Sequence, residues 1–259
     1  MTEGSASGIN SPFSIFVLAA SIVILASFVV WEINCPAPLL DFRIFKNKAF
    51  AFGNAASFAN FMVLAGIDFI IPFYLELAEG LKTFQVGLFM FFYSTIYSVC
   101  APFTGRLADD KRFGFMEGAA SSLACLACIL FAFTIQVPGI LYVIIFITAW
   151  AIANALFIPH NKRLIFVNVP KDMQGVGSGV FNTFNNLSMI FGVCAFQAIF
   201  SAMTHSANIP DPQSMAESGW SINAVFSAFR NIFVFAGILY LVTLIFGVLA
   251  QRHAAKALR

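Results

Sequence analysis

Long stretches with no charged residue, or with a single one, constrain the fold of this chain more than any other feature. A helix needs about 20 mostly apolar residues to cross a bilayer, and barrel strands would instead show alternations of roughly ten residues. The uncharged segment 118–161 is too long for one helix, and Pro138-Gly139 provides a turn that divides it. The sequence therefore predicts an all-α membrane protein with seven transmembrane helices, within residues 12–31, 49–75, 83–105, 118–135, 140–161, 173–203 and 227–251.

The composition excludes several other classes of protein. Hydrophobic residues make up 60% of the chain and charged residues 10%, whereas a soluble domain carries about 25% charged residues. So little charge also argues against a disordered chain or a nucleic-acid partner, and makes the lipid bilayer the expected surroundings. Cys125 and Cys128 lie in an apolar run without a polar partner, which indicates helix packing and no metal site. No motif for a cofactor, for ATP hydrolysis or for an enzyme is present, so we expect no cofactor.

The basic residues predict the orientation of the helices. Twelve of the fourteen fall on one side of the predicted membrane, and only Lys82 and Arg230 fall on the other. Since basic residues concentrate in cytoplasmic loops, the N-terminus is expected outside the cell membrane and the C-terminus in the cytoplasm. The twelve are Arg43, Lys46, Lys48, Arg106, Lys111, Arg112, Lys162, Arg163, Lys171, Arg252, Lys256 and Arg259.

Predicted helices two to four and five to seven look like two copies of one unit. The second helix leaves through 69–75 (FIIPFYL) and the fifth through 156–162 (LFIPHNK), and in each copy a Gln and a Gly then open the next helix. Pro72 and Pro159 would lie at opposite faces of the membrane. Three-helix repeats of inverted topology are typical of transporters whose substrate site lies near the bilayer midplane.

Four segments together resemble the major facilitator superfamily. Residues 105–109 (GRLAD) resemble the loop motif of the family, and 38–47 (PLLDFRIFKN) resemble the entry to the second half of fourteen-helix drug:proton antiporters. Residues 72–76 (PFYLE) and 175–179 (GVGSG), with Asn182, resemble two further helix ends of that group. The resemblance runs from about Trp31 to Ala250 in matching order.

This resemblance implies the C-terminal half of such a transporter. Residues 1–45 would form an outer segment, a linker helix and a cytoplasmic connection, 46–251 a six-helix half, and 252–259 a cytoplasmic tail. The implied function is proton-coupled export of small, possibly amphipathic compounds by alternating access, with an N-terminal half as partner. The implied gate motif is Gly105, Arg106 and Asp109, in which a tight turn at Gly105 places Asp109 against a helix of the other half. The chain departs from the family at Asp110, Arg112 and Asn185, and contains no N-terminal half.

Asp68 is the one carboxylate inside a predicted apolar helix. It shares a helix face with Asn54, Ser57, Phe61 and Leu64, at spacings of three and four residues. Such a stripe suits a proton or cation pathway, because a buried carboxyl group can be neutral or charged near physiological pH. The alternative is that Asp68, about one turn from the outer helix end, only reaches interfacial water.

Other polar residues in the helices also have two interpretations. Asn182 and Asn186 share a face of the sixth helix, Asn154 lies in the fifth, and each can bind substrate or bond a neighbouring helix. Tyr93 and Tyr97 form an i, i+4 pair that provides an aromatic wall for a substrate or ordinary packing.

Two ionisable residues near the predicted cytoplasmic ends have structural interpretations. Glu117 opens the fourth helix, where the helix dipole favours a carboxylate. His160 lies beside Asn161, Lys162 and Arg163, which predicts interfacial solvation.

A competing hypothesis is a truncated or split-gene membrane protein that transports nothing and serves at most as an assembly partner. The presence of a separately encoded N-terminal half distinguishes the two hypotheses.

Overall fold

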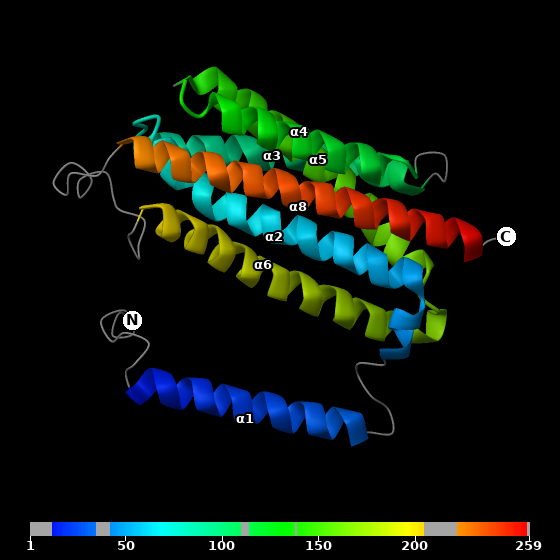
Figure 1. Ribbon diagram of the computed structural model, residues 1–259. Coiled ribbons are helices and arrows are strands. Elements are labelled where there is room, and N and C mark those ends of the chain that lie inside the picture. The colour runs from blue at the N-terminus through cyan, green and yellow to red at the C-terminus, as the bar shows by residue number, and fades with distance from the viewer. Residues whose placement is uncertain (1–11, 35–41, 110–113, 138, 205–221, 258–259) are drawn as a thin grey trace. The chain divides into compact units, whose positions relative to one another are not determined.

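The computed structural model describes residues 12–34, 42–109, 114–137, 139–204 and 222–257. The chain divides into two compact units, Met1–Phe42 and Arg43–Arg259. The first contains α1 (Pro12–Asn34), a helix of 23 residues. The second contains the bundle in Figure 1, whose long helices are α2 (Lys48–Leu77), α3 (Thr83–Asp109), α4 (Met116–Thr134), α5 (Ile140–Val167), α6 (Gln174–Thr204) and α8 (Ile222–Ala257).

The prediction of an all-α membrane protein is confirmed. The described part of the chain contains seven long α-helices and no strand. Six of these, α2 to α6 and α8, are long and apolar enough to cross a bilayer. The break predicted at 136–139 falls between α4 and α5, with Pro138 itself outside the described residues. The chain is therefore a multi-pass membrane protein.

Several helices continue beyond the predicted apolar stretches. α3 continues through Gly105 to Asp109, so the tight turn expected at Gly105 is wrong. The prolines do not end their helices either, since α2 continues past Pro72 to Leu77 and α5 past Pro159 to Val167. A helix keeps its backbone hydrogen bonds where its side chains reach the interface, so loss of hydropathy does not mark its end.

The two expected triplets, α2–α4 and α5–α8, are interlocked rather than side by side. α2 packs mainly on α6 and α8, and α5 packs mainly on α3 and α4. α8 also packs along α4, as Figure 1 shows. The first helix of each triplet therefore packs on the second and third helices of the other triplet. A two-fold relation between inverted repeats requires this arrangement.

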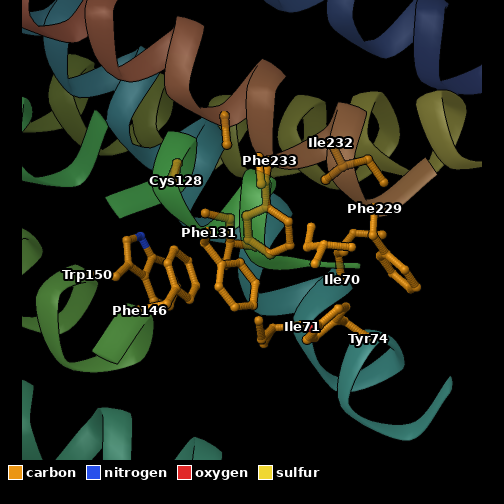
Figure 2. Close-up of a cluster of buried hydrophobic side chains, with 14 of the residues drawn as sticks. Ile70, Ile71, Tyr74, Cys128, Phe131, Phe146, Trp150, Phe229, Ile232 and Phe233 are labelled. Atoms are coloured by element: carbon orange, nitrogen blue, oxygen red, sulfur yellow. The ribbon is translucent and has the colours of Figure 1, made fainter. Parts of the chain in front are cut away.

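A cluster of aromatic and aliphatic side chains fills the centre of the bundle toward the end where α2 finishes. In Figure 2, Phe131 of α4 lies among Phe146 of α5, Phe233 of α8 and Tyr74 of α2. The Tyr74 ring meets Phe131 and Phe229 edge-on at centroid distances of 5.3 and 5.4 Å. Edge-to-face pairs stabilise such packing beyond the burial of area, so this cluster holds four helices together.

Candidate functional site

Asp68 occupies the one place where α2 is uncovered. Between Ala49 and Leu77 it is the only exposed residue of this helix, and every other residue is buried or half-buried. Since α2 continues to Leu77, Asp68 lies about 14 Å along the axis from the helix end, deeper than the single turn expected. Within the described residues, the Asp68 side chain makes no hydrogen bond or ion pair. An ionisable group in this setting is free to bind a proton or a cation.

An aromatic wall lies beside Asp68. The Tyr93 ring stacks on Trp150 with centroids 4.5 Å apart and on Tyr97 at 6.4 Å. The Asp68 carboxylate lies within electrostatic range of the Tyr93 hydroxyl. The structure thus brings together Asp68 of α2, the predicted tyrosine pair of α3 and Trp150 of α5.

Trp150 is anchored by a polar chain that runs into the bundle. Its Nε1 donates to the Tyr240 hydroxyl at 2.7 Å, and its backbone oxygen accepts from Asn154 Nδ2 at 2.9 Å. Asn60 Nδ2 in turn donates to Asn154 Oδ1 at 3.4 Å. Asn154 is only 1% exposed, so here it positions the aromatic wall instead of lining an open surface.

Asn54 and Ser57 do not share the surroundings of Asp68. Both are 1% exposed, although they lie on the same helix face. Ser57 Oγ donates to Asn185 Oδ1 of α6 at 2.9 Å, which is the helix-packing role left open by the sequence. Asn54 Nδ2 donates to the Phe50 oxygen at 2.9 Å, and no partner for Asn54 Oδ1 exists in the described part of the chain. Because α6 covers this part of α2, the polar stripe is buried at one end and open at the other.

Asn182 and Asn186 are exposed on α6, beside the buried Asn185. Large apolar side chains surround them on the same helix, among which Ile190 is 62% and Phe191 56% exposed. α3 is the least covered of the six helices, with Phe91 70% and Phe103 62% exposed. These two helices therefore present the widest surfaces to lipid or to a partner.

The gate motif lies at the end of α3. Gly105 is half-buried within the helix, and no atom lies within 4 Å of the position that a Cβ would take there. The Arg106 side chain is exposed, and the Asp109 side chain lies outside the described residues. No group of three His, Cys, Asp or Glu side chains is placed to bind a metal within the described chain.

His160 differs from its expected surroundings, whereas Glu117 lies in the first turn of α4 with a structural role, as expected. The expectation that His160 is solvated is wrong, because its side chain is 6% exposed and Nδ1 lies 2.7 Å from the Leu156 oxygen. Glu117 is 1% exposed and accepts from Asn161 Nδ2 at 2.9 Å and from Gln251 Nε2 at 3.1 Å. A carboxylate at a helix N-terminus thus proves to be the centre of a bonded network between three helices.

Comparisons with known proteins agree with this architecture. A model of the Major Facilitator Superfamily matches residues 5–193. The chain is 24% identical over 181 residues to the riboflavin transporter RibZ of Clostridioides difficile, which covers 70% of this chain and 40% of that protein. It is 26% identical over 220 residues to the quinolone resistance protein NorB of Staphylococcus aureus, which covers 81% of this chain and 45% of that protein.

The chain spans less than half the length of these curated relatives. Its family is nevertheless clear, because the family model matches well over half of the chain and the described helices form the bundle expected for one half of such a protein. The chain belongs to the major facilitator superfamily.

Proposed function

We propose that this chain is the C-terminal half of a secondary active transporter that exports small, amphipathic compounds in exchange for protons. The two halves would rock against each other about a central cavity. Asp68 would carry the proton, and the wall formed by Tyr93, Tyr97 and Trp150 would receive the apolar part of the substrate. Asn182 and Asn186 would face the partner half or the cavity from α6.

The observation that carries this proposal is the exposure of Asp68. A carboxylate in an apolar helix is costly, and such groups normally face a bundle interior or a water-filled cavity. Here the six-helix bundle leaves it uncovered beside an aromatic surface. A mostly apolar surface with a few placed polar or ionisable groups is the usual lining of a site for small molecules, and the partner half would close such a surface into a cavity.

The curated relatives support the same class of function. One is described as a riboflavin transporter and another as a quinolone resistance protein. An aromatic wall is suited to planar compounds, because flat rings stack on tyrosine and tryptophan.

The proposal is tested by replacing Asp68 in the assembled transporter, with both halves co-expressed and reconstituted into vesicles. Asp68→Asn keeps the size and hydrogen bonding of the side chain but cannot ionise. It should abolish transport driven by a pH gradient while substrate exchange without a gradient continues. Asp68→Glu should keep part of the driven transport. Asp172→Asn, which removes an exposed carboxylate outside the long helices, is the matched control and should behave as the wild type. Unchanged pH-driven uptake by Asp68→Asn contradicts the assignment.

The second candidate function is that of a non-transporting assembly partner. The chain spans 40–45% of the length of the two relatives above. We expect the polypeptide alone to insert in a membrane and transport nothing, and co-expression with a matching N-terminal half to restore transport. Asp109→Ala should then weaken that transport, because the gate would lose its anionic contact with a helix N-terminus. Failure of every matching N-terminal half to restore transport favours the second candidate.

A further inference from the structure

A cavity of about 500 Å³ opens between α3, α4, α5 and α8 at one end of the bundle. This is the end at which α3, α5 and α8 finish, and we call it the basic end because it carries Arg106, Lys162, Arg163, Arg252 and Lys256. The volume lies within the roughly 300–1,000 Å³ that is usual for small-molecule sites. The cavity is separate from the surface around Asp68, because none of the residues that line the cavity lies on that surface. Its lining is Ala108, Gly114, Glu117, His160, Arg163, Leu164, Val167, Asn168, Gln251, Ala254 and Ala255.

A buried carboxylate forms part of this lining. Glu117 is 1% exposed, and its two described partners, Asn161 and Gln251, are neutral amides. No ion pair to Glu117 exists in the described part of the chain. Each carboxylate oxygen accepts one bond of the two that it can accept, so acceptor capacity remains. A buried charge normally has a counter-charge, and the described residues supply none to Glu117.

The fold itself does not require a carboxylate at this place. In the inverted repeat, Asn161 follows Pro159 by two residues as Tyr74 follows Pro72. Around Tyr74 the bundle closes with apolar rings, Phe131 of α4 and Phe229 of α8. Around Asn161 it closes with Glu117 of α4 and Gln251 of α8. The same helices thus meet at both ends. Within the described residues, the contact of α4 with α8 is made by apolar rings around Tyr74, whose hydroxyl donates to Glu79, and by Glu117 and Gln251 at the basic end, next to the cavity.

α8 is shaped to come close to Glu117. A Cβ at Gly247 would lie 2.9 Å from Glu117 Oε1 and 3.3 Å from its Cδ, so glycine allows this approach. The Asn161 amide reaches across to the Gly53 oxygen of α2 at 3.1 Å and fixes the other side of the carboxylate. Glu117 is therefore held in one position by Asn161 of α5 and Gln251 of α8, with Asn161 itself fixed by α2, as a preformed ligand-binding group would be.

A cationic side chain faces the same cavity. Arg163 is half-buried, lines the cavity and lies within electrostatic range of the His160 ring. Its guanidinium is suited to the paired bonding of a phosphate or carboxylate. Leu164, Val167 and three alanines form the remaining wall, which is apolar. The cavity thus offers an anionic group, a cationic group and an apolar wall.

We propose that this cavity binds a small zwitterion, with its primary ammonium against Glu117 and its phosphate or carboxylate against Arg163. Two sources provide this chemistry at a membrane surface. One is the headgroup of an aminophospholipid, and the other is a soluble amino-phosphate or amino acid. On the topology that the basic residues predict, this end of the bundle faces the cytoplasm.

The proposal is tested by thermal unfolding of the purified chain with two probes. One probe is phosphoethanolamine in detergent solution, and the other is phosphatidylethanolamine in nanodiscs compared with phosphatidylcholine, whose trimethylated ammonium donates no hydrogen bond. We expect a saturable rise in Tm with at least one probe. A rise with phosphoethanolamine identifies a site open to water, and a rise with phosphatidylethanolamine alone identifies a site open to lipid.

Matched variants separate the cavity from general charge effects. Glu117→Gln and Arg163→Gln should each weaken binding and raise the apparent Kd by about tenfold or more. Asp172→Asn and Lys162→Gln remove the same charges from exposed positions outside the cavity and should bind as the wild type. Ala254→Leu, which leaves both charges and fills the cavity, should also weaken binding, so the test survives if Glu117→Gln fails to fold. No rise with either probe, or equal binding by all variants, overturns the proposal.

Discussion

The close approach of α6 to α2 at Gly192 allows a quantitative test of the packing. Gly192 of α6 lies against the backbone of α2, and a Cβ at this position would overlap the Met62 carbonyl oxygen and lie 2.9 Å from its carbon. Ordinary contact of a Cβ begins near 3.4 Å, so in Gly192→Ala the two helices must separate by at least about 0.5 Å. The contact is backbone, and a side-chain rotation cannot relieve it.

The expected cost follows from the behaviour of overpacked cores. Forcing one extra methyl group into a filled space destabilises a protein by about 1–3 kcal/mol. Gly179→Ala is the matched control, because the same change on the same helix meets no atom within 4 Å. Both variants gain about 1 kcal/mol of helix propensity, so the difference between them isolates the overlap.

Thermal unfolding of both variants in detergent measures this difference. At roughly 2–4 °C per kcal/mol for a chain of this size, Gly192→Ala should unfold about 2–12 °C below Gly179→Ala. The Ser57–Asn185 hydrogen bond joins the same two helices and would be strained by the same separation. Equal melting temperatures for the two variants would show that α2 and α6 do not approach as closely as described.

Three further results are expected. Tyr240→Phe leaves the buried Trp150 Nε1 without its acceptor and should lower the free energy of unfolding by about 1–3 kcal/mol, whereas Tyr142→Phe on the 41% exposed Tyr142 should change little. Ser57→Ala removes the donor to Asn185 and should cost about 1 kcal/mol, while Ser94→Ala, at an exposed serine bonded within its own helix, should cost less; equal costs refute the interhelical role. A reporter fused after Arg259 should be cytoplasmic and a tag before Pro12 external, and labelling of the loop around Ser214 from the cytoplasm would contradict this topology.

Hydropathy predicted the helices well because an apolar stretch of sufficient length has few alternatives in a bilayer. The predicted 49–75 and 140–161 correspond to α2 and α5, with extensions of only a few residues at most ends. Helix ends were predicted less well, as Gly105 shows, because charge marks the edge of the lipid and not the last hydrogen-bonded turn.

The partners of polar side chains were beyond sequence reasoning. Helical periodicity placed Ser57 and Asp68 on one face, but could not show that α6 covers the first and leaves the second open. Trp150 and Tyr240 were missed because they are distant in sequence, although Trp150 stands one turn before the polar Asn154 that was noticed. The similarity between 69–75 and 156–162 was the one sequence signal that bears on these contacts, since an inverted repeat constrains which helices become neighbours.

The interlocking of the two triplets has a consequence for the order in which the bundle forms during synthesis. α2, α3 and α4 leave the ribosome before α5, α6 and α8, yet the main partners of α2 are α6 and α8, and that of α3 is α5. Until α8 is made, Glu117 has no bond from Gln251, and until α6 is made, Ser57 has no Asn185. Native pairing therefore waits for the last helix, and a nascent chain that stops before α8 would present buried polar groups to lipid or to the insertion machinery.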